Sequence, residues 1–448
     1  MKLEGFKENT KKKIIVISFT VLCLLLIAGV YLYTSYAFYE ETKNFNVING
    51  TVEDPGDLYF AYYVDGKISR TMPSKNTGYT LDTTKSSCDN GVTVDWDYSK
   101  WKANIYYENY SATDKTRTKC TLFFNKTAKT VKTALGNIEV NSYKPDLTKS
   151  ACDTSNCESH EKGIFETTDA DGTSYYYRGA VENNYLKFAG YFWRVVRING
   201  NGSIRIIYDG TSAHANGESS ADRQYGTSQF NTNYNNNMYV GYMYTSGEAH
   251  GTGTSSAIKT NADKFYTDKL SSYASKLDTN AGFCGDRSNL NQQSGVGTGT
   301  VITYNKGYLR VEESAPTLTC ENASDYYTVA SASSGNKKLS YPIGLITADE
   351  MMLAGHAGGV FDGSYNHMKS NNGSYLVTGN SFWTMTPAGG YNPFGYTGWG
   401  AHVFGVYASG GIDDNGVNDT YGLRPVVNLK SGVKITGSGT KTNPYVVS

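Results

Sequence analysis

This 448-residue sequence has no excess of charge of either sign, because 41 lysines and arginines balance 41 aspartates and glutamates. A nucleic-acid-binding surface needs a basic field, so this balance argues against nucleic acid as a partner. The motifs H-E-x-x-H, G-x-S-x-G, Walker A and C-x-x-C are all missing, and the six histidines are scattered along the chain. We therefore expect a protein that is not an enzyme.

Charge is also absent from one continuous apolar segment, residues 14–33. At about 1.5 Å per residue, a helix of this length matches a hydrocarbon core of about 30 Å. The segment before it, residues 1–13, is rich in lysine, whereas the first charged residues after it are Glu40 and Glu41. The sequence thus predicts a cell-membrane protein with a cytoplasmic head, one transmembrane helix and extracytoplasmic C-terminal domains. A signal peptide cleaved near Ala37 is the alternative, and it exports the same domains.

Cysteine is scarce, and one of the seven, Cys23, lies within the predicted helix. The remaining six form an even set, as disulfides in an oxidising compartment require. Six cysteines allow 15 pairings. Because sequence neighbours fall within single segments, we expect three local disulfides: Cys88 with Cys120, Cys152 with Cys157, and Cys284 with Cys320.

The exported part is expected to be mainly β with a few helices, an α+β class. We predict a stalk at residues 34–50, a small disulfide-braced β domain at 51–127, a linker at 128–160, a C-terminal domain at 161–432 and a terminal strand at 433–448. In the small domain, Asp65-Gly66 between β-prone runs predicts a two-residue hairpin turn. Further strands are expected near residues 92–96 and 118–124.

In the C-terminal domain, two hairpins are expected at residues 163–178, turning at Asp171-Gly172, and at 191–208, turning at 199–202. Residues 210–253 are rich in Asn, Gly, Ser, Thr and Tyr, and predict a long insertion. Thr347, Glu350 and Gly355 are typical of a capped helix, on which Asp349 and Glu350 stabilise the dipole. A longer helix is predicted from an apolar stripe at intervals of three and four: Ile258, Ala262, Phe265, Tyr266, Leu270, Tyr273 and Leu277.

The C-terminal block predicts three strands, at residues 381–387, 401–408 and 421–429. In order, the segments SYYYRGAVENNYLKFAGYFWRVVRINGNGSIRIIYDG, LITADEMMLAG, FWTMTP and DDNGVNDTYGLRPVVNLK resemble an uncharacterised exported domain of Gram-positive gut bacteria, over about residues 163–432. More distantly, FWTMTP and GLRPV are similar to the closing strands of the formylglycine-generating-enzyme and C-type-lectin-like fold.

This second resemblance implies a lectin-like C-terminal domain. The generating enzymes of that superfamily depend on two cysteines and a bound copper ion in their C-terminal half. No cysteine occurs in residues 381–448 of this sequence. The resemblance therefore implies the other use of the fold, as a scaffold whose surface loops bind proteins or glycans, and function has to be argued from the site itself.

An aromatic and glycine-rich loop at about residues 388–400, together with the two residues that follow it, is the candidate ligand-binding site. Rigid aromatic side chains give contact area at low entropic cost, and neighbouring polar residues adapt their hydrogen bonds, which is typical of binding loops. The alternative is that the largest aromatics pack inward and the others form ordinary turns. The candidate residues are Tyr391, Asn392, Phe394, Tyr396, Trp399 and His402.

Oxygen ligands also crowd at Asp413, Asp414, Asn415 and Asp419, as a calcium site would need. The spacing does not match the twelve-residue calcium loop, and Asp-Asn-Gly is common turn chemistry, so no cofactor is the main expectation and calcium the weaker one. Together these patterns predict a membrane-anchored surface protein that binds an extracellular glycan or protein ligand. The alternatives are an enzyme acting on envelope polysaccharide through two carboxylates from distant segments, and a structural surface component.

Overall fold

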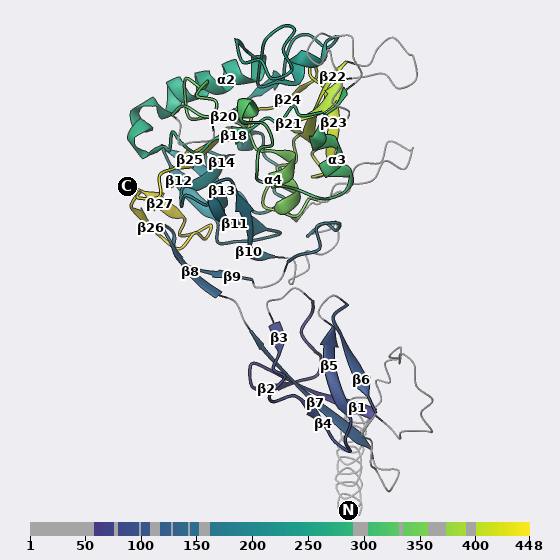
Figure 1. The fold of residues 1–448 in the computed structure, drawn as a ribbon. Helices are drawn as coiled ribbons and strands as arrows, with labels where there is room; N and C mark the ends of the chain where they lie inside the picture. The colour runs from purple at the N-terminus through teal and green to yellow at the C-terminus, as the bar shows by residue number, and fades with distance from the viewer. Residues whose placement is uncertain are drawn as a thin grey trace, which may run out of the picture. The chain divides into compact units, whose positions relative to one another are not determined.

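The structure is a computed structural model that describes residues 58–75, 79–97, 100–107, 117–126, 129–141, 144–151, 162–289, 303–330, 335–356, 373–390 and 400–448. Its contacts divide the chain into two compact units (Figure 1), unit 1 ending at Lys126 and unit 2 comprising residues 76–78 and 127–448. The predicted head, membrane helix and stalk lie outside the described residues, as do Cys152 and Cys157. Within the described ranges, no helix combines the length and the apolar character needed to cross a membrane.

Unit 1 contains a five-stranded sheet in the order β2-β1-β7-β3, in which β4 also pairs with β7. The strands of this sheet are β1 (Leu58–Val64), β2 (Lys67–Ser69), β3 (Tyr79–Leu81), β4 (Ser87–Cys88) and β7 (Thr118–Lys126). A separate hairpin joins β5 (Thr93–Asp97) and β6 (Lys102–Tyr106). Asp65 and Gly66 both have positive φ at the β1–β2 turn, as the sequence predicted, because this tight hairpin turn needs left-handed backbone.

Aromatic residues form the core of unit 1. Trp96 from the hairpin meets both Trp101 and Phe124 edge-on, with its ring centroid 5.2 Å from each. The predicted disulfide between Cys88 and Cys120 is present and joins β4 to β7. So small a core gains from such a covalent link.

Unit 2 is built on two larger sheets (Figure 1). The eight-stranded sheet runs in the order β10-β11-β13-β12-β27-β26, and β14 pairs with both β13 and β25. Its strands are β10 (Gly163–Asp169), β11 (Gly172–Arg178), β12 (Tyr185–Phe188), β13 (Tyr191–Ile198), β14 (Ile204–Gly210), β25 (Val426–Leu429), β26 (Ile435–Thr436) and β27 (Tyr445–Val447). The terminal segment thus supplies two strands, with β26 at the edge.

The second sheet of unit 2 has six strands in the order β15-β24-β21-β22-β23, and β19 also pairs with β21. They are β15 (Thr227–Gln229), β19 (Thr303–Tyr304), β21 (Phe382–Gly390), β22 (Ala401–Val406), β23 (Ile412–Gly416) and β24 (Thr420–Gly422). Two short pairs, β16 (Met243–Tyr244) with β17 (Thr254–Ser255) and β18 (Phe283–Cys284) with β20 (Tyr326–Tyr327), complete this part. The predicted disulfide between Cys284 and Cys320 is present.

The segment predicted as a polar linker contains a hairpin, so this interpretation was incomplete. It consists of β8 (Lys129–Thr133) and β9 (Gly136–Val140). Its buried residues Leu135, Ile138 and Val140 belong to the core of unit 2. In each strand, the alternation of apolar and polar residues is only a few residues long and includes lysines and threonines. A pattern this short does not identify a strand from the sequence.

The hairpin of β10 and β11 turns one residue earlier than predicted. Asp169 pairs with Gly172, so Ala170 and Asp171 form the turn. The Asp169 carboxylate accepts hydrogen bonds from the backbone N–H groups of Asp171 and Gly200, both at 2.9 Å. This side chain closes the turn and fixes its position.

Within the described residues, helices are few, as expected, and short. They are the α-helices α2 (Ala257–Phe265), α3 (Lys306–Glu312) and α4 (Ala348–Leu353), the π-helix η4 (Tyr266–Leu270) and the 3₁₀-helices η2 (Ala221–Arg223), η3 (Asn237–Val240), η5 (Ser271–Lys276) and η6 (Ala323–Asp325). The stripe predicted from Ile258 to Leu277 begins on α2 but does not continue as one α-helix. The π turn shifts the register, and Tyr273 is 39% exposed, contrary to the prediction.

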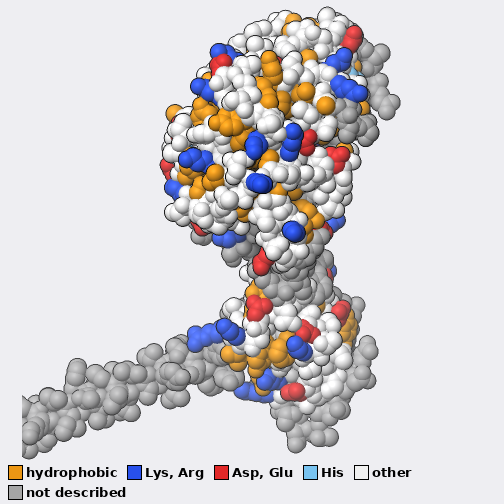
Figure 2. Space-filling view, turned by 90° about the vertical axis from the view of Figure 1, so that its left-hand side faces the viewer, with side chains coloured by type: hydrophobic (Ala, Val, Ile, Leu, Met, Phe, Trp, Pro, Cys, Tyr) orange, Lys and Arg blue, Asp and Glu red, His pale blue; other side chains and the backbone are white. Residues whose placement is uncertain are grey.

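One hydrophobic core connects the two sheets of unit 2 and the helices beside them. Trp193 from β13 and Trp383 from β21 are both fully buried in it. On the face seen in Figure 2, basic and acidic side chains are interspersed over the larger unit, in keeping with the balanced charge of the sequence.

Candidate functional site

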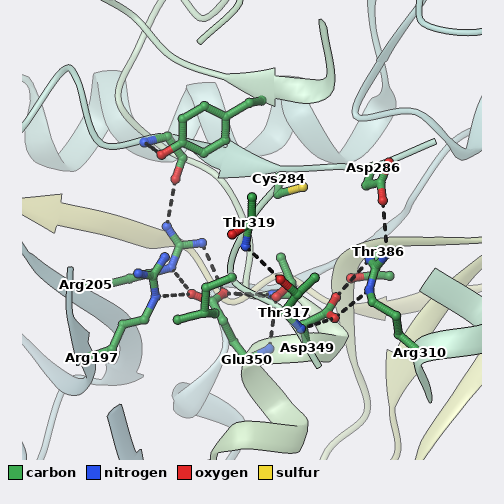
Figure 3. Close-up of a pocket in the computed structure, with 14 residues that line it drawn as sticks. Arg197, Arg205, Cys284, Asp286, Arg310, Thr317, Thr319, Asp349, Glu350 and Thr386 are labelled. Atoms are coloured by element: carbon green, nitrogen blue, oxygen red, sulfur yellow. Dashed lines mark hydrogen bonds and ion pairs between the residues drawn. The ribbon is translucent and has the colours of Figure 1, made fainter. Parts of the chain in front are cut away.

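A small pocket in unit 2 brings three arginines and three carboxylates together (Figure 3). Arg197 on β13 and Arg205 on β14 are direct cross-strand partners, so their side chains share one face of the sheet. Glu350 reaches them from α4. Its Oε1 accepts a hydrogen bond from Arg197 Nε at 2.9 Å and also forms an ion pair with Arg205 Nε.

The helix cap positions Glu350. Thr347 Oγ1 accepts a hydrogen bond from the Glu350 backbone N–H, and Glu350 Oε2 accepts one from the Thr347 backbone N–H, both at 3.0 Å. This is the predicted capping box, and it aims the carboxylate at the sheet. Burial acts to raise the pKa of Glu350, but Arg205, Arg197 and the Thr347 N–H outweigh it and hold that pKa below its ordinary value.

Arg310 from α3 holds the other two carboxylates. Its Nε lies 2.7 Å from Asp349 Oδ1, and its Nη1 lies 3.0 Å from Asp286 Oδ2. Burial acts to lower the pKa of Arg310, but the two carboxylates raise it above its ordinary value. The cavity volume of about 20 Å³ is enough for about one water molecule. Since each carboxylate is paired with a guanidinium, the pocket is better explained as a structural ion network than as a catalytic cleft.

A second buried network explains the arginine of the GLRPV segment. Arg424 Nη2 lies 3.1 Å from Asp209 Oδ1, and its Nη1 donates to the Leu376 carbonyl oxygen at 2.7 Å. Arg223 Nε lies 2.9 Å from the same Asp209 oxygen, and Arg194 Nη1 lies 4.0 Å from Asp209 Oδ2. Burial lowers the pKa of Arg424 to about 9. Three cations thus share one carboxylate, and Arg424 has a structural role.

His356 and Ser374 form a hydroxyl–imidazole pair, with Nε2 and Oγ 2.8 Å apart. Both side chains are fully buried, and His356 Nδ1 lies 2.6 Å from the Gly410 carbonyl oxygen. Burial lowers the pKa of His356 to about 4, which keeps the ring neutral near pH 7. A nucleophile needs access to its substrate, so this pair is structural.

Of the predicted ligand-binding residues, Tyr391, Asn392, Phe394, Tyr396 and Trp399 lie outside the described residues. His402 is described, on β22, just after this loop. Its Nδ1 lies 2.6 Å from Asp414 Oδ2 on β23. Because a carboxylate only accepts, Nδ1 carries the proton and Nε2 faces Tyr234, whose hydroxyl lies 3.5 Å away. These three residues form the Tyr234–His402–Asp414 cluster.

Two glycines make room for Tyr234. A Cβ on Gly400 would lie 1.7 Å from the Tyr234 carbonyl oxygen, and a Cβ on Gly416 would lie 2.9 Å from its ring. The backbone N–H of Ala401 donates to that carbonyl oxygen at 2.6 Å. The Asn-rich insertion therefore rests directly on the ends of β22 and β23. The sequence did not single out Tyr234 among 38 tyrosines.

Three of the four predicted calcium ligands form hydrogen bonds within the protein and lie on different faces of one strand. Asp413, Asp414 and Asn415 are consecutive on β23, so their side chains alternate between faces. Asp414 binds His402, and Asn415 Oδ1 accepts hydrogen bonds from the hydroxyls of Tyr407 and Tyr421 at 2.7 and 2.8 Å. Asp419 is exposed. The described residues contain no group of three His, Cys, Asp or Glu suited to a metal ion.

Another histidine, His214, lies between two carboxylates. Its Nδ1 is 2.9 Å from Glu218 Oε1, and its Nε2 is 2.9 Å from Asp222 Oδ1. The hydrogen bond with His214 and that from the Ala215 N–H lower the pKa of Glu218 to about 2. Burial acts to raise the pKa of Asp222, but hydrogen bonds from Ser220, Thr211 and His214 outweigh burial and hold this pKa below its ordinary value. These contacts fasten the segment after β14.

This arrangement predicts a pH-dependent stability. A depressed folded-state pKa stabilises the fold above the ordinary Glu value of 4.5, and the contribution is lost as the pH falls toward 2. Glu218→Gln should therefore lower the melting temperature at neutral pH and flatten its decline between pH 4.5 and 2. Tryptophan fluorescence of the full chain during heating measures both effects. Parallel curves for variant and wild type would contradict this role.

Comparisons with protein-family models, curated proteins and solved structures found no significant match to this chain.

Proposed function

We propose that this chain is a membrane-anchored surface protein that binds a glycan or protein ligand through the loops around the Tyr234–His402–Asp414 cluster. The observation that carries the proposal is the partial exposure of this cluster. The side chains of His402 and Asp414 are 16% and 21% exposed to solvent. In the sequence, His402 follows the predicted aromatic loop at residues 391–399 by three positions.

The contrast with the pocket favours binding over catalysis. Asp286, Asp349 and Glu350 are nearly inaccessible and each is held by arginine. A polysaccharide-cleaving enzyme needs one carboxyl with a raised pKa beside its bond, whereas Glu350 has a lowered one. The carboxylates of this pocket therefore give little support to the alternative of an envelope enzyme.

The proposed location rests on the sequence and on the disulfides. The apolar run at residues 14–33 with its basic head supplies an anchor. The disulfides Cys88–Cys120 and Cys284–Cys320 fit an oxidising exterior. The lectin-like character of unit 2 belongs to the same proposal, since a rigid sheet that presents variable loops suits ligand recognition.

Binding of the purified full chain to glycan arrays and to cell-surface protein extracts tests the proposal. We expect binding that falls about tenfold or more in His402→Ala and Tyr234→Ala, the size of effect typical of a side chain central to an interface. Asp419→Ala, an exposed change after the end of β23, should bind like the wild type. Unchanged binding in both cluster variants, or no binding to the glycan arrays and the protein extracts, would overturn the proposal.

A further inference from the structure

An aromatic surface lies beside the Tyr234–His402–Asp414 cluster. The rings of Tyr304 and Tyr308 have centroids 4.8 Å apart, and Tyr308 lies 6.2 Å from Phe404. Phe404 on β22 pairs across the sheet with Asp414 on β23, so these two side chains share a face. Tyr308 comes from α3 and packs over this face. Phe404 is itself buried, and its contact with Tyr308 places the tyrosine pair over the face that also carries Asp414.

Two carboxylates border these rings. Glu312 lies one turn after Tyr308 on α3 and interacts with its hydroxyl, and Asp414 approaches from the sheet. Burial raises the pKa of Tyr308, and the negative charges of Glu312 and Asp414 raise it further. Tyr304, Tyr308 and Glu312 are all partly exposed. A ligand could therefore reach both the rings and the charges.

These partly exposed carboxylates differ from the buried acids of unit 2. Asp209, Asp286, Asp325, Asp349 and Glu350 each pair with at least one arginine. Across the described ranges, by contrast, neither lysine nor arginine forms an ion pair with Glu312 or Asp414, and the ion-pair partner of Asp414 is His402. Negative charge beside aromatic faces is the environment that attracts a cation, because the face of a ring carries negative charge density as well.

We propose that this surface binds a protonated amino group of an amino-sugar glycan, an inference that rests on the proposed ligand-binding function. Glu312 and Asp414 neutralise the ammonium group, and the rings of Tyr304 and Tyr308 contact its hydrogens and the C–H face of the sugar. The Tyr234 hydroxyl and the His402 ring exchange hydrogen bonds with neighbouring sugar hydroxyls. These additional hydrogen-bonding groups favour a glycan over a lysine side chain, because a lysine side chain needs only the rings and the carboxylates.

The test is calorimetric titration of the full chain with a glucosamine tetrasaccharide and with its N-acetylated counterpart. The two share ring geometry and linkage but differ in charge. We expect the free amine to bind at least about tenfold more tightly, and its affinity to fall as salt is added. Glu312→Gln should weaken binding of the free amine about tenfold. Its affinity for the acetylated sugar should equal that of the wild type. Glu313→Gln, at the exposed neighbouring position, is the matched control.

Each other outcome decides against the proposal. Equal affinity for both tetrasaccharides would overturn amine recognition while leaving glycan binding intact. Binding of a lysine-rich peptide without binding of the amino sugar would overturn the glycan as its source. Binding of other array glycans but of neither tetrasaccharide would overturn the inference alone. No binding to any array glycan or to any cell-surface protein would overturn the proposed function too. Asp414→Asn, checked for folding by its melting temperature, should reproduce the Glu312→Gln loss.

Discussion

Asp209→Asn is expected to lower the free energy of unfolding by about 3–5 kcal/mol, the usual cost of breaking a buried ion pair by removing one partner. Asp209 is 1% exposed and is the shared carboxylate of Arg194, Arg223 and Arg424. Without it, three buried guanidinium groups lose their counter-charge. Asparagine has nearly the same volume as aspartate, so the loss of stability reports the removed charge and not a change in packing.

Guanidinium chloride denaturation followed by tryptophan fluorescence measures this change, because Trp193 and Trp383 are fully buried in the same unit. Asp419→Asn removes an exposed acid and serves as the control, with an expected change within about 0.5 kcal/mol. A loss below about 1 kcal/mol for Asp209→Asn would contradict the prediction. The arginines would then be satisfied by carbonyl oxygens such as that of Leu376.

Elements set by local chemistry could be predicted from the sequence. Asp65-Gly66 supplies the left-handed backbone that its hairpin turn needs, and Thr347 with Glu350 closes a capping box within four residues. The two described disulfides also join sequence neighbours, as expected. The turn and the capping box each depend on residues at most three positions apart, so their sequence patterns contain most of the relevant physics. The cysteines of the two disulfides lie 32 and 36 residues apart, and they could be paired because each pair falls within one predicted segment.

Elements set by tertiary contacts could not be predicted in the same way. The exposure of Tyr273 depends on a π turn that no periodicity in the sequence indicates. Tyr234 meets His402 only because Gly400 and Gly416 leave space for it, and 168 residues separate Tyr234 from His402. Nor did the sequence indicate that His402 and Asp414, assigned to two different candidate sites, would bind each other.

Glu350→Ala is expected to cost about 3–5 kcal/mol of unfolding free energy, plus about 1 kcal/mol for the lost cap. Glu350 is the joint partner of Arg197 and Arg205 and accepts the Thr347 N–H. Arg205 is fully buried and loses its counter-charge in the variant, whereas Arg197 keeps Asp169 at 3.0 Å. The same denaturation measurement applies. Glu313→Ala, an exposed residue, should change stability by less than about 0.5 kcal/mol.

A double variant separates the charge from the cap. Arg205→Met combined with Glu350→Met removes both members of the buried pair and fills their volume with apolar atoms, which is often neutral or stabilising in such pairs. We expect it to recover most of the loss seen in Glu350→Ala, with a remaining deficit of about 1 kcal/mol from the cap. A double variant as unstable as Glu350→Ala would show that packing and capping, instead of the unpaired Arg205 charge, explain the cost. Because Arg197 retains Asp169 in both variants, the comparison isolates the Arg205–Glu350 pair.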